Sequence, residues 1–304
     1  MRQNALGRSG LTVSVVGLGC SSFGRRLDLA GTRAVIDAAL DAGITHLDTA
    51  NIYGGDGASE RLIGEVLEGR RDRIVIATKF GMRMGHDSGE PRGSRAYVRG
   101  AIDGSLARLR TDRVDLYYYH EPDGVTPLSE TIGALAELAD EGKIRAFGVS
   151  NVDAVQLREA VELGGDRLAA VQNEYSLLER EAEADVLPLA HELGVGFVPY
   201  FPLASGLLTG KFRRNEEPPA GTRLAGRPER LTAAVFDHLE ALEAFAAERG
   251  HTPLDLAIAA LASQPGVASV IAGAMSPEQV ARNVAAADWE LSADDLAALA
   301  VEVV

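Results

Sequence analysis

The amino-acid sequence predicts an α/β fold, a (β/α)8 TIM barrel with an N-terminal β-hairpin and extra C-terminal helices, in a single domain over residues 1–304. Short β-branched runs alternate with longer segments of helical period, and this pair of elements repeats eight times along the chain. The first strand-to-helix turn, GLGCSSFG at 17–24, lacks the GxGxxG spacing expected of a doubly wound dinucleotide-binding sheet. A closed barrel is therefore favoured over an open sheet.

The chain opens with NALGRSGL at 4–11, a glycine-containing turn between short apolar elements, which predicts a hairpin that plugs the N-terminal mouth of the barrel. The strands that follow are short and apolar, as parallel strands buried on both faces must be. The predicted strands are 13–19, 45–49, 73–80, 114–120, 144–151, 168–175, 195–200 and 268–273.

Segments of helical period separate these strands, and Ser59, Ser129, Ser276 and Ser292 stand where helix N-caps are expected. Residues 201–231 are too many for an ordinary connection, which indicates a functional loop. The predicted helices are 32–43, 59–69, 95–110, 128–142, 153–164, 184–194, 238–250, 253–264, 276–287 and 292–301.

Composition excludes several classes of partner. The net charge of −14, without a basic run, disfavours nucleic acid and anionic membranes. No apolar stretch is long enough to span a bilayer, and no signal peptide is evident, so we expect a cytoplasmic protein. The single cysteine, Cys20, rules out an internal disulfide and a cysteine-rich zinc site, and we identify no metal ligands. Composition does not indicate an oligomeric state.

Four ionisable side chains follow the predicted strands at the edge where barrel enzymes carry their active sites. Asp48 ends the second strand, Tyr53 lies in the loop after it, Lys79 ends the third strand and His120 ends the fourth. Each has an ordinary structural explanation, as a turn cap, a loop aromatic, a snorkelling lysine or a hydrogen-bonded core histidine. Fold stability does not explain all four on one rim, because buried charges must be paired.

The chemistry that this set fits is proton donation to a carbonyl oxygen. A free tyrosine has a pKa of about 10, so we expect the Lys79 ammonium to lower the pKa of Tyr53 toward the working range. The Asp48 carboxylate would fix the lysine and keep it charged. His120 would then hold the carbonyl oxygen beside Tyr53.

With these residues placed, the sequence resembles the aldo-keto reductase superfamily over essentially the whole chain. The motifs that carry the resemblance are LDTANIYG (47–54), IATKFG (76–81), YYYHEPD (117–123) and GKIRAFGVSN (142–151). Through PYFPLASGLLTGKF (199–212) and IAGAMSPEQVARN (271–283) it is similar to the bacterial branch related to potassium-channel β-subunits. The resemblance implies a barrel that binds NADPH and reversibly reduces aldehydes or ketones, with Asp48, Tyr53, Lys79 and His120 as the catalytic tetrad.

The resemblance also implies a set of cofactor-binding residues. Ser150, Asn151 and Gln172 match positions that hold the nicotinamide carboxamide, and Tyr200 matches the aromatic residue that stacks on the nicotinamide ring. Further positions match those along the pyrophosphate and ribose or around the adenosine: Phe201, Pro202, Leu203, Ser205, Lys211 and Arg223, and then Gly273, Gln279 and Asn283.

One position departs from the family pattern. Met275 stands where many relatives have an arginine or a hydroxyl residue against the 2′-phosphate of NADP. Arg282 replaces a frequent acid, and its spacing from Met275 suggests that both lie on one side of a helix, where the arginine would reach the same phosphate. We therefore expect NADP and leave NAD open.

Two other functions stay open at this point. A Schiff-base aldolase could use Lys79 as its strand-end lysine, although Asp48 would favour the ammonium over the neutral amine that an imine needs. A cofactor-binding regulatory subunit with little turnover is the second alternative, because of the channel-related branch.

The expected substrate is a small-molecule carbonyl compound. Phe23, Phe80 and Glu121 are predicted to face it together with Tyr53, and the polar loop 81–97 offers Arg83, Arg92 and Arg95. The chain leaves little tail beyond its last predicted helix, so we expect an open site for a polar or bulky substrate such as a sugar or a secondary metabolite.

Overall fold

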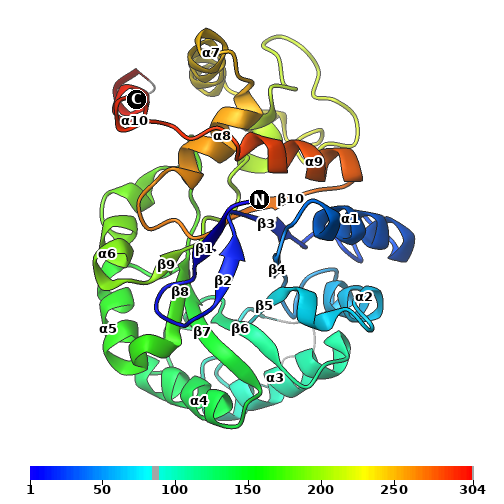
Figure 1. Ribbon diagram of the computed structural model, residues 1–304, viewed down its shortest axis with the longest axis vertical. Coiled ribbons are helices and arrows are strands. Elements are labelled where there is room, and N and C mark those ends of the chain that lie inside the picture. Colours follow the sequence, from blue (N-terminus) through cyan, green and yellow to red (C-terminus); the bar gives the residue numbers. More distant parts are fainter. Residues whose placement is uncertain (84–88, 303–304) are drawn as a thin grey trace.

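The structure, a computed structural model, describes residues 1–83 and 89–302 and contains a ring of eight parallel strands (Figure 1). Neighbouring strands pair in the order β10-β3-β4-β5-β6-β7-β8-β9. Backbone hydrogen bonds of Phe197 with Gly266 and Ala268 connect β9 to the segment before β10, which closes the barrel. The strands are β3 (Val16–Gly19), β4 (His46–Asp48), β5 (Val75–Phe80), β6 (Val114–Tyr119), β7 (Ile144–Ser150), β8 (Leu168–Gln172), β9 (Gly196–Phe197) and β10 (Val270–Gly273).

The helices lie outside the strand ring, as Figure 1 shows, and the predicted (β/α)8 barrel is confirmed. Helix α7, which lies between β9 and α8, and helix α10 after α9 are extra to the eight-fold repeat. Among the residues described here, no helix is long and apolar enough to cross a membrane. The helices are α1 (Leu29–Asp41), α2 (Ala58–Val66), α3 (Arg95–Leu109), α4 (Leu128–Asp140), α5 (Ala154–Gly164), α6 (Val186–Leu193), α7 (Ala233–Glu248), α8 (Pro253–Ala262), α9 (Pro277–Ala286) and α10 (Ala293–Glu302).

The N-terminal hairpin is present, and it divides the first predicted strand. Strands β1 (Gln3–Ala5) and β2 (Thr12–Ser14) pair antiparallel, so the first half of the predicted strand 13–19 belongs to the hairpin and only the second half to the barrel. Leu6, Leu11 and Val13 are buried in the same apolar cluster as Leu116 and Tyr118 of β6. The hairpin therefore plugs the barrel, as predicted.

Close packing inside the barrel explains why position 148 is a glycine. Gly148 of β7 lies opposite Tyr118 of β6, and a β-carbon added at this position would come within 2.5 Å of the tyrosine ring and 2.6 Å of the Ala170 carbonyl oxygen. No real β-carbon makes such contacts, so only glycine leaves room for the ring. Tyr118 can therefore fill the barrel interior.

Two of the four predicted serine caps are wrong. Ser292 precedes α10 and caps it by accepting a hydrogen bond from the backbone N–H of Asp295 at 3.1 Å. Ser276 caps α9 by accepting a hydrogen bond from the backbone N–H of Gln279. Ser59 instead lies inside α2, where its hydroxyl donates to the Cys20 carbonyl oxygen at 3.0 Å and ties the helix to the barrel rim. Helix α4 begins before Ser129, with a proline in the cap position. A hydroxyl near a helix start serves tertiary contacts as readily as a cap.

The predicted long connection 201–231 is confirmed as a segment without strands or long helices. It contains two short 3-10 turns, Ala204–Thr209 and Pro228–Arg230, and otherwise has irregular backbone. Arg214 ties its middle to α7 by hydrogen bonds to Asp237 at 2.6 Å and to Glu240 at 2.8 Å. The connection is thus fixed at one side while the rest extends toward the barrel rim.

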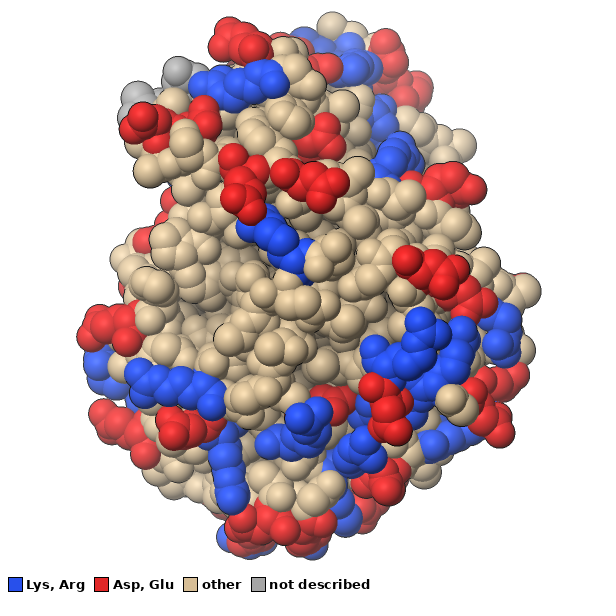
Figure 2. Space-filling view, viewed as in Figure 1, with Lys and Arg blue, Asp and Glu red and all other residues tan. Residues whose placement is uncertain are grey.

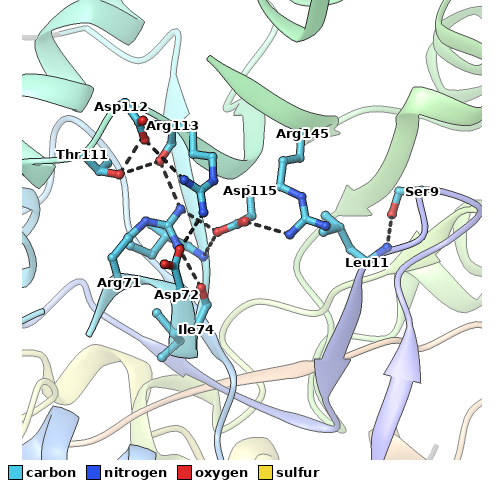
Figure 3. Close-up of polar contacts among 11 residues, drawn as sticks. Ser9, Leu11, Arg71, Asp72, Ile74, Thr111, Asp112, Arg113, Asp115 and Arg145 are labelled. Atoms are coloured by element: carbon cyan, nitrogen blue, oxygen red, sulfur yellow. Dashed lines mark hydrogen bonds and ion pairs between the residues drawn. The ribbon is translucent and has the colours of Figure 1, made fainter. Parts of the chain in front are cut away.

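Charged side chains surround the hairpin on the N-terminal face of the barrel, as Figure 2 shows from the side of Figure 1. Asp115 of β6 is buried there and accepts from Arg71 at 2.7 Å, from Arg145 at 3.1 Å and from the backbone N–H of Ile76 at 2.9 Å (Figure 3). One carboxylate therefore joins the starts of β5, β6 and β7.

We predict that Asp115→Ala lowers the free energy of unfolding by about 3 kcal/mol, because removing one partner leaves Arg71 largely buried and unpaired. The control is Asp72→Ala, since Asp72 pairs with Arg113 at the surface and its side chain is 82% exposed. That change should alter stability by less than about 1 kcal/mol. Urea unfolding of both variants measures the difference, and equal losses would contradict the role of Asp115.

Candidate active site

A buried ion pair between β4 and β5 forms the base of the candidate site. The Nζ of Lys79, which is fully buried, donates to Asp48 Oδ1 at 2.5 Å and to the carbonyl oxygen of Thr49 at 2.9 Å. The second carboxylate oxygen of Asp48 accepts from Gln172 Nε2 of β8 at 3.0 Å. Three strand ends thus supply partners for both charges, as a pair removed from water requires.

The ion pair keeps Lys79 protonated. Burial lowers the pKa of the Lys79 ammonium, but the Asp48 carboxylate together with Tyr53 and Cys20 raises it by more, so the net pKa lies above its usual value. The expectation that Asp48 holds the lysine charged is confirmed.

Tyr53 and His120 complete the group of four. Tyr53 is half-buried in the loop after β4, and the Lys79 ammonium lies 5.3 Å from the centroid of its ring. The rings of Tyr53 and His120 meet edge to face, with centroids 6.0 Å apart and an interplanar angle of 82°. The structure therefore brings together all four side chains that the sequence placed on one rim.

The expected lowering of the Tyr53 pKa is wrong for this structure. Burial raises the pKa of the phenol, Lys79 lowers it and the Asp48 carboxylate raises it again, so the net pKa is above its usual value. The sequence identified the lysine but gave no measure of the desolvation that opposes it. At neutral pH Tyr53 is thus a neutral phenol with a proton to donate.

His120 is neutral at physiological pH. Burial, assisted by the Lys79 charge, lowers the pKa of its imidazole to about 3. Its backbone N–H donates to the Phe80 carbonyl oxygen at 2.8 Å, and its own carbonyl oxygen accepts from Asn151 Nδ2 at 2.8 Å. These backbone bonds fix the residue, while the neutral ring keeps a buried Nδ1 that has no hydrogen-bond partner among the described residues.

The ends of β7, β8 and β9 place four of the predicted cofactor residues beside the tetrad. Ser150 is buried and donates to the Gln172 carbonyl oxygen at 2.6 Å. Asn151 has a left-handed φ of 56°, and its Oδ1 accepts from the Tyr200 hydroxyl at 2.7 Å. Asn151 thus contacts both Tyr200 and His120, and the hydrogen bonds form one continuous chain along the rim.

The backbone after β9 is strained. Phe201, Ala204 and Ser205 have φ values of 54°, 45° and 60°, a region that side chains other than glycine rarely occupy. Pro202 is buried and Leu203 partly buried, while the Phe201 ring is 45% exposed. Strain of this kind persists where a site requires a particular backbone shape.

Basic side chains from three elements lie close together beyond this segment. Burial lowers the pKa of Lys211, and the charges of Arg26, Arg223 and Arg282 lower it further. Arg26 donates to the Gly221 carbonyl oxygen, and Arg223 donates to Ser21 Oγ at 3.2 Å, so the long connection is attached to the loop after β3. We call Arg26, Lys211, Arg223 and Arg282 the rim cations.

The sequence analysis missed Arg26 as a member of this group. The signal available was the adjacent pair Arg25 and Arg26 directly after a strand-end turn, on the edge where site residues gather. The partner that fixes Arg26 lies 195 positions away in the chain, which local patterns do not reveal.

The argument that placed Met275 and Arg282 on one helical side is wrong. Helix α9 has Ser276 as its N-cap, so Met275 precedes it, and the Met275 N–H donates to Gln279 Oε1 at 2.8 Å. Arg282 is exposed on α9 and reaches the rim cations independently of Met275. The other two adenosine positions differ in exposure: Gly273 is exposed at the end of β10 and Asn283 is buried in α9.

Two of the three predicted substrate-facing residues do not face a site. Phe80 is fully buried, with its ring 5.3 Å from that of Tyr119 and 4.8 Å from that of Tyr117. Phe23 is also fully buried, in the core cluster outside the barrel. We withdraw both from the substrate-facing set and retain Glu121, which is exposed beyond the end of β6.

Two of the arginines predicted in loop 81–97 are engaged in bonds within the protein. Arg95 begins α3, and its side chain bonds to Glu137 of α4. Arg92 donates to the Gly81 carbonyl oxygen at 2.7 Å. Residues 84–88 of this loop lie outside the described residues.

Comparison with known proteins gives the same assignment as the geometry. A family model described as the Aldo/keto reductase family matches residues 15–301. The chain belongs to this family. Aldo-keto reductase AKR11C1 from Bacillus halodurans, solved in its holo form, is 33% identical to this aldo/keto reductase, with a TM-score of 0.85. The match covers 100% of this chain and 97% of that chain. Family membership supports an oxidoreductase that uses a nicotinamide cofactor.

We predict that two buried histidines make the fold sensitive to acid. Burial lowers the pKa of His46 to about 4 and that of His120 to about 3, whereas both take up a proton near pH 6.5 when unfolded. Between these values the unfolded chain binds more protons, so the free energy of unfolding should fall as pH drops, by about 1.4 kcal/mol per pH unit for each histidine.

Urea unfolding between pH 7 and pH 4.5 measures this dependence. His46→Asn and His120→Asn should each reduce the slope by about one proton, while the same change at exposed His238 serves as the control. Unchanged slopes in both buried variants would show that the histidines are not the source.

Proposed function

We propose that this aldo/keto reductase is an NADPH-dependent carbonyl reductase in which Tyr53 is the general acid. The observation that carries the proposal is the buried Lys79–Asp48 pair beneath Tyr53, with neutral His120 against the same ring. A proton donor, a fixed cation and a neutral hydrogen-bonding imidazole at one point suit a carbonyl oxygen that gains negative charge. The reverse oxidation uses the same groups.

The raised pKa of Tyr53 is compatible with this role. The nicotinamide cofactor, when bound, supplies the hydride that converts the carbonyl group to an alkoxide. An alkoxide is a much stronger base than a phenolate, so it takes the Tyr53 proton even when burial makes the phenol a weaker acid. The ammonium of Lys79, 5.3 Å from the ring centroid, stabilises the phenolate that remains.

The residues present fit a dinucleotide. Ser150, Asn151 and Gln172 would hold the carboxamide, and Tyr200 would stack on the nicotinamide ring. The strained backbone at Phe201 and the segment after it offers main-chain groups to the pyrophosphate. The rim cations would meet the phosphates, and their four positive charges favour NADPH over NADH although Met275 supplies none.

The aldolase alternative is disfavoured by the state of Lys79. An imine forms from a neutral amine, whereas Asp48 at 2.5 Å raises the pKa of Lys79 above its usual value. Borohydride treatment in the presence of a ketone tests this directly, and a covalent label on Lys79 would overturn the reductase proposal.

The substrate that we propose is a polar or bulky carbonyl compound. With Phe23 and Phe80 buried, the residues left to contact it are Tyr53 and the exposed acid Glu121. A carboxylate at the entrance favours hydroxyl-bearing substrates such as sugars over small apolar aldehydes. Relative kcat/KM over a panel of both classes tests this preference.

We predict that Tyr53→Phe lowers turnover by a factor of about 100 to 10,000 and leaves dinucleotide affinity unchanged, because the change removes only the proton that is donated. Fluorescence titration gives the affinity, and cofactor oxidation with the carbonyl panel gives the rate. Tyr97→Phe on α3 is the matched control and should behave as wild type. Tight NADPH binding with no turnover by the wild-type protein would instead support a regulatory subunit.

We also predict that Lys211→Ala and Arg223→Ala each weaken NADPH binding by about tenfold or more, with a smaller effect on NADH, because NADPH brings one more phosphate to the rim cations. Arg213→Ala is the control, since Arg213 lies two positions from Lys211 but bonds to Glu243 at 2.5 Å. Equal losses of affinity for NADPH and NADH would show that the rim cations do not determine which cofactor is preferred.

A further inference from the structure

A second group of cations lies on the opposite face of the barrel from the tetrad. The chain around the starts of β4, β5, β6 and β7 borders an open pocket of about 140 Å³. Its lining includes four arginines, Arg71, Arg73, Arg113 and Arg145, and two aspartates, Asp72 and Asp115, so it carries two net positive charges. Figure 2 shows basic side chains gathered on this face near the position of α2 in Figure 1. This concentration stands out in a protein of net charge −14.

Asp115 holds two of the guanidinium groups in place. It is 3% exposed and bonds to Arg71 at 2.7 Å and to Arg145 at 3.1 Å, as Figure 3 shows. Arg71 is fixed further by donating to the carbonyl oxygens of Ile74 and Arg113, each at 3.0 Å. The arginines therefore lose little conformational freedom when they meet a ligand.

Several donors in this pocket are not used within the protein. The Nε of Arg71 is buried and has no hydrogen-bond partner among the described residues. Arg73 forms no ion pair within ranges 1–83 and 89–302, and over the same ranges Arg145 donates only from Nη1. An ion-pair network that served stability alone would pair its cations, and a buried unpaired donor is unfavourable.

We propose that this pocket binds a phosphoryl group, either as free phosphate or as part of a small phosphate ester. A phosphate dianion matches the two net positive charges, and its oxygens can accept from arginines on several sides. The cavity has room for one such group beside water, since a water molecule occupies about 30 Å³. Arg71, Arg73 and Arg145 are the residues that we assign to the ligand.

The test is the unfolding temperature of the wild-type protein as inorganic phosphate is added at constant ionic strength, with sodium chloride as the balancing salt. Binding to the native state should raise the midpoint in a saturable way by about 2 °C or more, and acetate should raise it less. Arg73→Ala and Arg145→Ala should each lose most of the phosphate-dependent increase. Arg73 has no ion pair within the described part of the chain, so Arg73→Ala should leave the fold unaffected.

Two controls separate this pocket from other basic groups. Lys211→Ala with Arg223→Ala removes rim cations and should keep the phosphate response, while Arg167→Ala removes a surface arginine that pairs with Asp140 and should also keep it. A response that persists in the Arg73 and Arg145 variants but disappears in the rim variant would overturn the proposal, as would no phosphate-specific response in the wild type. Tighter binding of a hexose monophosphate than of phosphate would assign the site to an ester, and equal affinity would assign it to the free ion.

Discussion

The candidate active site depends on one interaction, the buried ion pair between Lys79 and Asp48. An ammonium and a carboxylate without water are stable only when the remaining hydrogen-bonding capacity of both is used. Here Thr49 and Gln172 provide it, so β4, β5 and β8 must end at matching heights. The closed barrel meets this requirement because every parallel strand ends at the same edge. The position of Tyr53 follows from that fixed cation.

The two groups of cations lie at opposite ends of the barrel and serve different purposes there. At the rim, Arg26 and Arg223 attach the long connection to the loop after β3, so the same side chains that gather positive charge also shape the entrance. At the other end, Asp115 joins the starts of three strands and holds Arg71 and Arg145 around a pocket. The hairpin fills the barrel mouth on the same face as this pocket.

The sequence was sufficient for the fold and for the tetrad because both depend on short patterns. Parallel strands place Asp48, Lys79 and His120 on one edge whatever the packing details. Strand alternation also excludes Phe80 from the site, since it follows the inward-pointing Lys79 and must point outward, and this rule should have corrected our expectation. The direction of the Tyr53 pKa shift could not be predicted from the sequence, because it results from burial combined with the opposing effects of Lys79 and Asp48. The place of Arg26 among the rim cations could not be predicted either, because the residue that it bonds to, Gly221, is far away in the sequence.

Gln172 has a consequence for how variants of this enzyme are to be interpreted. Its side-chain nitrogen holds the second oxygen of Asp48, while its backbone oxygen accepts from Ser150. One residue therefore supports the acid of the ion pair and the rim at the end of β7. A substitution here would remove the side-chain bond to Asp48 and leave the backbone bond to Ser150, so loss of activity in a Gln172 variant does not by itself identify a ligand contact.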